Sequence, residues 1–134
     1  IYEFFNFENN VPRKSMLNEL EYHYHLGYTY FKMGDYELAL SSFQKVVNQP
    51  QYYSRTKVRD AYIRMGDAEF AMSRFWPAME QYNKGIAMSQ AQSDYALYQK
   101  SMSYGFVDRN KQKISTLLEL IEKHPKSAYV DDAF

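Results

Sequence analysis

Apolar and aromatic positions recur every three or four residues along most of the chain. In the first long segment they stand at Leu17, Leu20, Tyr24, Tyr28 and Phe31. This spacing places their side chains on one face of a helix, because an α-helix completes a turn in about 3.6 residues. No segment alternates apolar and polar residues over the length of a strand. The pattern therefore predicts an all-α chain.

Short breaks divide this helical pattern into pairs of helices. At the first break, Gly34 can adopt the left-handed conformation that ends a helix, and Asp35 can cap the next one. That next helix is predicted over 36–47 and stops before Pro50. Two further pairs are predicted, over about 57–72 with 76–88 and over about 94–107 with 111–123. Each pair is typical of an antiparallel helical hairpin.

A small set of residues returns along the chain at a nearly constant interval. The second helix of each pair holds a small or aliphatic residue followed four positions later by a bulky one. The four such pairs begin 38, 39 and 36 residues apart: Ile1/Phe5, Ala39/Phe43, Ala78/Tyr82 and Ile114/Leu118. A proline follows three of them after 11 residues, at Pro12, Pro50 and Pro125. This period is typical of a solenoid, in which each unit buries its apolar face against the next.

The first complete repeat carries the most specific residues. It contains His23-x2-Leu26-Gly27-x2-Tyr30, then Ala39-x3-Phe43, and then Pro50. This arrangement resembles the tetratricopeptide repeat family, with His23 in place of the usual Trp. The resemblance implies an α-α superhelix, a right-handed solenoid of antiparallel helical hairpins.

The later repeats match the same pattern less completely. The second retains Met65-Gly66 and Ala78-x3-Tyr82 but has Glu69 at the position of Tyr30. The third is degenerate, with Ser101-Met102 where the others have an apolar residue before glycine. The intervals exceed the family's usual length of about 34 residues, so we expect lengthened helices or connections near 48–54 and 90–94.

These repeats predict one tetratricopeptide-like domain that is part of a longer array. Its expected units are a second helix of a preceding repeat at 1–12, repeats at 14–50, 54–89 and 94–125, and the start of a further repeat at 128–134. The last junction, Pro125 to Ala133, resembles repeat junctions in bacterial envelope proteins. This resemblance implies a periplasmic or outer-membrane-associated location, with the cytoplasm as the alternative.

Composition and charge narrow the classes of partner. The chain has 16 basic and 16 acidic residues, so no overall field attracts nucleic acid or an anionic membrane. A local basic stretch at Arg55, Lys57, Arg59 and Arg64 is interrupted by Asp60, as on a solvated helix face. No apolar run reaches the roughly 20 residues of a membrane span. We therefore expect neither a nucleic-acid partner nor direct membrane insertion.

The sequence offers little for catalysis or metal binding. His23 and His25 are two positions apart and diverge on a helix, while Glu19/His23 and Glu21/His25 each lack a further ligand. There is no cysteine, no glycine-rich phosphate loop, no nucleophile elbow and no HExxH motif. His124 lies in the last turn of a helix, where a cation complements the helix dipole. We expect no catalytic residue, cofactor or metal, and a protein that is not an enzyme.

Aromatic residues form 18% of the chain, 14 of them tyrosines, which suits both packing and recognition. The family resemblance implies that the first helices line a concave groove for a protein or peptide partner. Its expected residues are Glu21, Tyr24, Tyr28, Phe31, Lys32, Asp60, Ile63, Asp67, Phe70, Gln99, Ser103 and Phe106. The Lys/Asn pattern that some relatives use to hold a C-terminal carboxylate is absent, since Tyr24 and Tyr28 stand there instead.

Three alternatives to this hypothesis remain open. The aromatic residues can pack against the adjacent repeat or a long insertion instead of a partner. The chain can be a self-assembly module, associating through exposed terminal helices, since solenoid ends leave an apolar face to be covered. It can also be a regulatory segment of a larger enzyme or transcription regulator.

Overall fold

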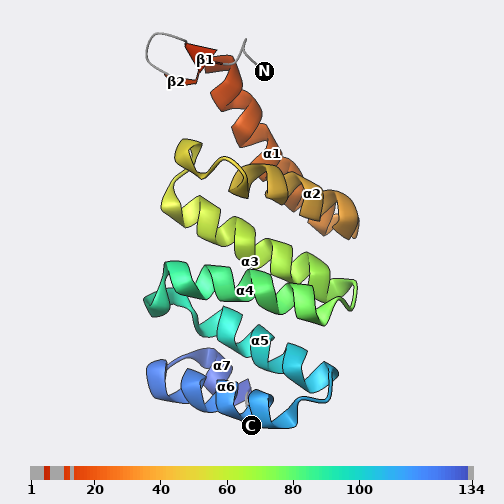
Figure 1. Cartoon of the computed structure of the whole chain (residues 1–134), viewed down its shortest axis with the longest axis vertical. Helices are drawn as coiled ribbons and strands as arrows, with labels where there is room; N and C mark the ends of the chain where they lie inside the picture. The colour runs from red at the N-terminus through yellow and green to blue at the C-terminus, as the bar shows by residue number, and fades with distance from the viewer. Residues whose placement is uncertain (1–4, 7–10, 13, 133–134) are drawn as a thin grey trace.

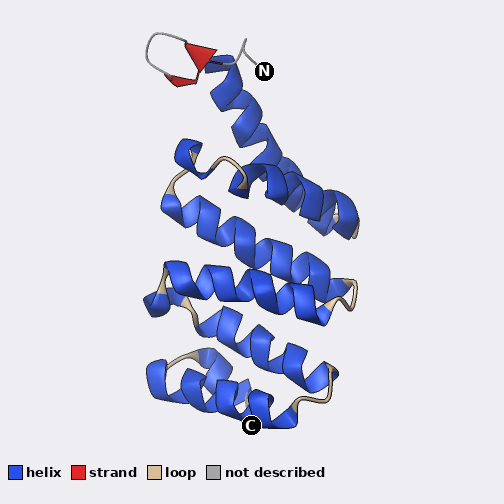
Figure 2. Cartoon of the chain, in the orientation of Figure 1, coloured by secondary structure: helices blue, strands red, loops and turns tan. Residues whose placement is uncertain are grey.

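The computed structural model describes residues 5–6, 11–12 and 14–132, with side chains from residue 21 to residue 132. Figures 1 and 2 show helices stacked in chain order, with a short two-stranded ribbon at one end. The strands are β1 (Phe5–Asn6) and β2 (Val11–Pro12). The helices are α1 (Lys14–Lys32), α2 (Tyr36–Val47), α3 (Arg55–Ala71), α4 (Phe75–Met88), α5 (Asp94–Phe106), α6 (Asn110–Lys123) and α7 (Ala128–Asp132).

Three antiparallel hairpins build the stack, and each second helix also packs on the first helix of the next hairpin (Figure 1). The predicted all-α solenoid is confirmed. Two 3-10 turns, η2 (Pro50–Tyr52) and η3 (Gln90–Gln92), lie in the connections between hairpins, where added length was expected. They let the chain cross from one hairpin to the next.

The N-terminal ribbon differs from the helix expected over residues 1–12. Phe5 pairs with Pro12 and Asn6 with Val11 in an antiparallel register, so the expected helix is wrong at these four residues. Pro12 explains part of the difference, because proline lacks an N–H and drives the preceding Val11 into an extended conformation. The rest of that segment, including Ile1, lies outside the described residues.

The three hairpin turns share one backbone geometry. Gly34, Ser73 and Asp108 all have positive φ, of 79°, 60° and 60°. The N–H of the following residue donates to a carbonyl five positions back, as from Asp35 to Tyr30 at 2.9 Å. This confirms the predicted role of Gly34 in ending α1. Asp35 lies at the N-cap position of α2, but its side chain makes no capping hydrogen bond, which corrects that expectation.

The turns also correct the alignment of the third repeat. Gly34 and Ser73 are 39 residues apart, whereas Ser73 and Asp108 are 35 apart. The sequence comparison used an interval of 36 for the third repeat, which placed Ile114 and Leu118 in the hairpin seam. Instead, these side chains are 58% and 60% exposed, whereas Ala39, Phe43, Ala78 and Tyr82 are all 0% exposed.

The corrected interval brings Lys113 and Leu117 into the seam positions. It also aligns the buried Ser101, rather than Met102, with Gly66. The wrong alignment arose because Ile114 and Leu118 are the more apolar pair, although they lie on another face of α6.

Close contact between paired helices depends on two glycines. A Cβ on Gly27 would lie 2.7 Å from Cζ of Phe43, and a Cβ on Gly66 would lie 2.7 Å from Cε1 of Tyr82. Each bulky ring of the second helix therefore occupies the space left by a glycine of the first. The motif glycines Gly27 and Gly66 therefore mark the helix–helix contact of the first two hairpins.

The C-terminal helix α7 begins at the position expected for a further repeat. Its Tyr129 ring lies against Tyr95 and Tyr98 of α5, with centroid separations of 5.5 Å and 5.4 Å. Residues 133–134 of that expected unit lie outside the described residues. Within the described part of the chain, no helix combines the length and the apolar character needed to cross a membrane.

Candidate functional site

The first helices α1, α3 and α5 carry the residues predicted to line a groove, and the structure joins three of them directly. The hydroxyl of Tyr24 donates to Oδ2 of Asp60 at 2.7 Å, and the hydroxyl of Tyr28 donates to the same oxygen. The two tyrosines belong to α1 and Asp60 belongs to α3. This cluster therefore connects the first repeat to the second, so these rings pack against the adjacent repeat, as one alternative proposed.

The environment of this cluster favours neutral tyrosines. Burial, followed by the hydrogen bond to Asp60 and its negative charge, raises the pKa of Tyr28 to about 12. The same causes raise the pKa of Tyr24 further. Both hydroxyls therefore remain hydrogen-bond donors at neutral pH.

A second cluster surrounds Asp67, also on α3. Its Oδ1 accepts hydrogen bonds from the hydroxyls of Tyr82 and Tyr95, at 2.6 Å and 2.9 Å. Its Oδ2 accepts one from Nη1 of Arg64 at 2.6 Å. Burial raises the pKa of the Asp67 carboxyl, and these hydrogen bonds and the charge of Arg64 oppose that shift. Arg64 also donates to Asp60 at 3.4 Å, so it links the two clusters.

Three predicted groove residues are unavailable to a partner. Asp67 is only 6% exposed because the donors above surround it. Ile63 is buried in the core against Gly85 of α4. Ser103 is buried and donates to the backbone carbonyl of Gln99 in its own helix. An interval of 36 residues aligns Ser103 with Asp67, whereas the interval of 35 between the turns aligns Met102 with it.

Other predicted groove residues form a polar rim. Glu21 is half-exposed and pairs with Lys57 of the next repeat at 2.8 Å, and its Oε2 lies 3.7 Å from Nε2 of His25. Lys32 is exposed at the end of α1. Gln99 is half-buried, and its side-chain amide donates to the hydroxyl of Tyr82 at 3.5 Å.

The three predicted phenylalanines lie at the turn end of the first helices. In the first repeat, Phe31 meets Tyr36 edge-on with ring centroids 5.3 Å apart. In the second repeat, Phe70 meets Phe75 in the same way at 5.3 Å. The two pairs occupy equivalent positions, 39 residues apart. Phe106 of the third repeat stacks on Phe75, with centroids 4.8 Å apart and an interplanar angle of 9°.

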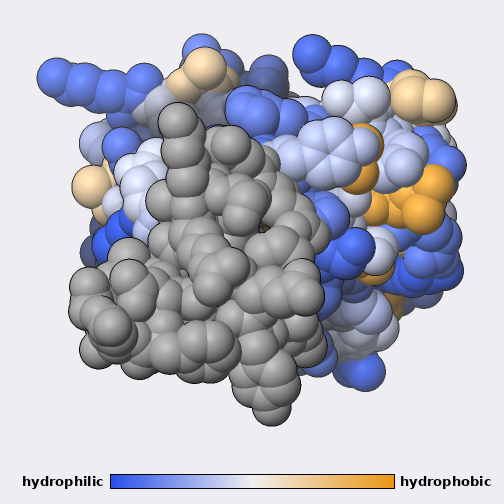
Figure 3. Space-filling view, turned by 90° about the horizontal axis from the view of Figure 1, so that it is seen from above, coloured by the Kyte–Doolittle hydropathy of each residue, from blue (hydrophilic) through white to orange (hydrophobic). Residues whose placement is uncertain are grey.

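We call this group of rings the aromatic edge; its members are Phe31, Tyr36, Phe70, Phe75, Trp76 and Phe106. Phe106 is 62% exposed and Trp76 is 51% exposed. Trp76 also contacts Tyr104 and the guanidinium of Arg109. Figure 3 shows a largely hydrophilic surface in which apolar side chains gather on the side of the hairpin turns. Sequence reasoning missed Trp76, although its position beside a turn was visible.

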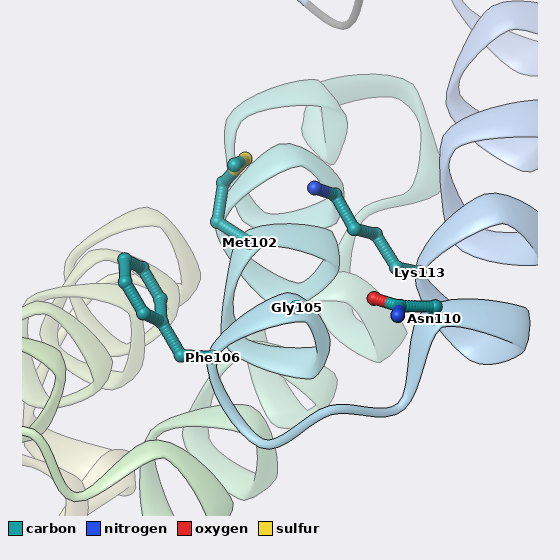
Figure 4. Close-up of a pocket in the computed structure, with 5 residues that line it drawn as sticks. All are labelled: Met102, Gly105, Phe106, Asn110 and Lys113. Atoms are coloured by element: carbon teal, nitrogen blue, oxygen red, sulfur yellow. The ribbon is translucent and has the colours of Figure 1, made fainter.

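A hollow of about 210 Å³ lies next to the aromatic edge, between α5 and α6. Its lining residues are Met102, Gly105, Phe106, Asn110 and Lys113. Figure 4 shows Gly105 at its base, with the side chains of Met102 and Lys113 extending on either side of it. The hollow is open, and its lining is of mixed polarity, with the apolar Met102 and Phe106 beside the amide of Asn110 and the amine of Lys113.

The comparison with known protein families decides the family question. The model of the tetratricopeptide repeat matches residues 18–91, which is more than half of the chain. The chain belongs to the tetratricopeptide repeat family. No match was found among curated proteins. The matched segment contains α1 from residue 18 onward and the whole of α2, α3 and α4. The third hairpin of this tetratricopeptide repeat protein continues it with the same turn geometry.

Tetratricopeptide repeats generally mediate protein–protein interaction, which fits the exposed rings described above. Among residues 21–132, no group of three or more acidic or histidine side chains is arranged to hold a metal ion. His124 instead contacts Oγ of Ser93 through its Nε2, at 3.0 Å.

The basic stretch of α3 in this tetratricopeptide repeat protein is engaged within the solenoid. Arg55 and Arg59 donate to backbone carbonyls of Met88 and Gln92, at 2.9 Å and 3.2 Å. Lys57 binds Glu21, and Arg64 binds the two aspartates of its own helix. Arg55, Lys57 and Arg59 thus connect neighbouring repeats, whereas the ion pairs of Arg64 lie within α3.

Proposed function

We propose that the chain is a non-enzymatic scaffold that binds a segment of a protein partner along the face of its first helices, at the aromatic edge. The exposure of Phe106 carries this proposal. A phenylalanine that is 62% exposed, yet held in place by Phe75 and Phe70, presents an ordered apolar surface to solvent. Exposed aromatic residues that are rigidly held are typical anchors of protein interfaces.

The location at the aromatic edge follows from what the other predicted residues do. Tyr24 and Tyr28 donate their hydroxyls to Asp60, so their polar groups are engaged within the protein. Phe31, Phe70 and Phe106 have no such polar group, and Phe31 and Phe70 are half-buried with Phe106 exposed. The ion pair of Glu21 and Lys57 lies on α1 and α3 as well, but away from their turn ends. A bound segment that extends along these helices from the aromatic edge would meet it there.

Selection of displayed random peptides on the immobilised chain tests this function. Enriched peptides should bind the native chain, and Phe106→Ala should weaken that binding at least about tenfold because an aromatic anchor is lost. Tyr22→Ala is the matched control, because Tyr22 is an aromatic residue that is similarly exposed at 59% but lies on α1 far from its turn end. Equal weakening by both variants would contradict the assigned surface, and the absence of any enriched peptide would contradict the function.

Self-association is a second candidate that one observation favours. Ile114 of α6 aligns with Met79 of α4, which is only 3% exposed, yet Ile114 itself is 58% exposed. Together with Leu118 it leaves an apolar strip that a second copy could cover. Light scattering over a range of concentrations would show a rising mass, and Leu118→Glu would abolish that rise. A constant monomer mass would contradict this candidate.

A bacterial envelope location completes the proposal. It is supported by the resemblance of segment 125–133 to repeat junctions in bacterial envelope proteins. In the structure residues 124–127 join α6 to α7, and Oγ of Ser127 donates to Asp94 at 2.7 Å. Fractionation of cells that carry the natural protein tests the location, since recovery in the cytoplasmic fraction would contradict it.

A further inference from the structure

The hollow beside Gly105 occupies a place that aromatic rings fill in the other two repeats. With the corrected interval of 35 residues, Gly105 aligns with Phe70 and Asn110 aligns with Phe75. The same alignment relates Phe70 and Phe75 to Phe31 and Tyr36 of the first repeat. Both rings of the aromatic pair are thus replaced in the third repeat, one by a hydrogen atom and the other by a short amide.

The backbone around this place keeps the geometry of the other repeats. The N–H of Asp108 donates to the carbonyl of Gly105 at 3.2 Å, as that of Ser73 does to Phe70 at 2.9 Å. The turn has therefore not collapsed onto the space that the rings leave. The hollow measures about 210 Å³. This exceeds the roughly 150 Å³ of a cavity that accommodates a benzene ring.

The lining favours an aromatic occupant. Met102 offers a thioether, which makes favourable contacts with aromatic rings. Phe106 also lines the hollow, but its ring stacks on Phe75 and is turned away from Asn110 and Lys113 (Figure 4). The aliphatic part of Lys113 covers Gly105, since its Cδ lies 3.1 Å from the place where a Cβ would stand. This flexible side chain can move aside when a ring enters.

The charge at the border favours an acidic group next to that ring. Among residues 21–132, no carboxylate lies within ion-pair distance of the Lys113 amine. Arg109, which contacts Trp76, adds a second positive charge at the same turn. A carboxylate of the partner would therefore find the Lys113 amine at the hollow, with the charge of Arg109 at the adjoining turn.

We propose that the hollow binds an aromatic side chain of the partner protein, with a neighbouring carboxylate of the partner paired to Lys113. The partner ring would take the place that Phe31 and Phe70 occupy in the preceding repeats. This inference rests on the proposed function and specifies the partner of the same surface: a segment in which an aromatic residue stands beside an acidic one.

The test uses short acetylated peptides with a central Phe-Asp pair, and matched peptides with Ala-Asp or Phe-Asn instead. Binding to the whole chain is followed by backbone amide NMR shifts and by titration. The expected result is shifts at Gly105, Phe106 and Asn110 with the Phe-Asp peptide, and affinity at least about tenfold lower for the Ala-Asp peptide. The Phe-Asn peptide should bind more weakly and with less salt dependence.

The decisive variant restores the missing rings. Gly105→Phe with Asn110→Phe reproduces the Phe70–Phe75 pair, so the variant should fold, keep its helical circular dichroism spectrum and lose peptide binding. Lys113→Met tests the charge alone, and should reduce binding of the Phe-Asp peptide to the level of the Phe-Asn peptide. The double variant is compared only after its thermal unfolding has been shown to be cooperative.

The outcomes separate this inference from the function on which it rests. Undiminished binding by the filled variant, or peptide shifts elsewhere on the first helices, would overturn the hollow as the site while leaving the scaffold function intact. If library peptides bind at Phe106 but the Phe-Asp peptide does not bind, the hollow is also overturned as the site, and the scaffold function again remains intact. Failure of every peptide, including the whole random library, would overturn both.

Discussion

Arg64 donates a hydrogen bond of 2.6 Å to Asp67, one turn further along the same helix. Asp67 also accepts a hydrogen bond from the hydroxyl of Tyr95 in the next repeat. Arg64 also donates a hydrogen bond to Asp60, which in turn accepts one from Tyr24 of the preceding repeat. The Arg64–Asp67 pair therefore links three repeats. The guanidinium further lies over the Tyr95 ring, 5.5 Å from its centroid. These hydrogen bonds thus form a continuous polar connection from α1 through α3 to α5, beside the apolar contacts between paired helices.

Removing the charge of Asp67 should destabilise the fold. Asp67→Asn leaves hydrogen-bond donors of Arg64, Tyr82 and Tyr95 incompletely satisfied in a buried site, so we expect a loss of about 1–3 kcal/mol in the free energy of unfolding. Denaturant unfolding followed by circular dichroism measures it. The control is Glu37→Gln, which breaks a surface ion pair with Arg74 and should change stability by less than about 1 kcal/mol. Equal effects would show that Asp67 has no special role.

The tyrosines bound to Asp60 should make the protein sensitive to high pH. Because the pKa of Tyr28 rises to about 12 in the fold, the folded protein holds its proton more tightly than the unfolded chain does. The resulting contribution of Tyr28 to the free energy of unfolding is fully present below about pH 10, and it is lost as the pH rises toward 12. Ultraviolet absorbance should show part of the tyrosine population ionising late, together with unfolding. A single early ionisation step in a chain that stays folded would contradict this.

Introducing glycine at a hairpin turn and removing glycine from one should have opposite effects on the stability of the protein. Ser73→Gly relieves a positive φ at an exposed side chain and should stabilise the protein by about 0.5–1 kcal/mol. Asp108→Gly should stabilise it less, since aspartate tolerates this conformation better than serine. Gly34→Ala should destabilise it by about 1–2 kcal/mol from backbone strain alone, because the space around Gly34 is empty. Thermal melting of the three variants gives the order, and any other order contradicts the shared turn geometry.

Two tryptophan substitutions test the alignment of the repeats. Ala39 is fully buried in the first seam, so Ala39→Trp should overpack it and cost about 1–3 kcal/mol or more. Ile114, which the repeat pattern in the sequence had aligned with Ala39, is exposed, so Ile114→Trp should change stability by less than about 0.5 kcal/mol. Melting temperatures of the two variants decide the point. Equal losses would favour the sequence alignment over the structural one.

Local signals in the sequence were sufficient for most of the architecture. Helical spacing, Gly34 at the first turn and the small residues Gly27 and Ala39 predicted the first hairpin closely. The second followed from Gly66 and Tyr82. These features act within a hairpin, where residues that meet are close in the chain. The N-terminal ribbon was missed because the spacing of Ile1 and Phe5 suggested a helix, although Pro12 was the stronger local signal.

The candidate site was predicted only in part, because exposure depends on neighbours from other repeats. Tyr24 and Tyr28 occupy the positions of groove residues, yet Asp60, 32 or more residues away, takes their hydroxyls. Phe106 was identified through an alignment that was wrong by one position, and it stands out only because Phe75 supports it from the preceding repeat. The hollow could not be found in the sequence. Gly105 and Asn110 leave space only because they align with the rings Phe70 and Phe75, and that alignment came from the turns in the structure.

By itself the sequence determined the helices, their pairing into hairpins and the repeat family, because periodicity, turn residues and small–large seam pairs act over short stretches of chain. The tertiary structure alone decided which aromatic residues hold the repeats together and which face solvent. It also decided the alignment of the third repeat and the position of the hollow. The physical reason is that burial and hydrogen bonding at these sites come from residues about one repeat away, whose positions local spacing does not specify.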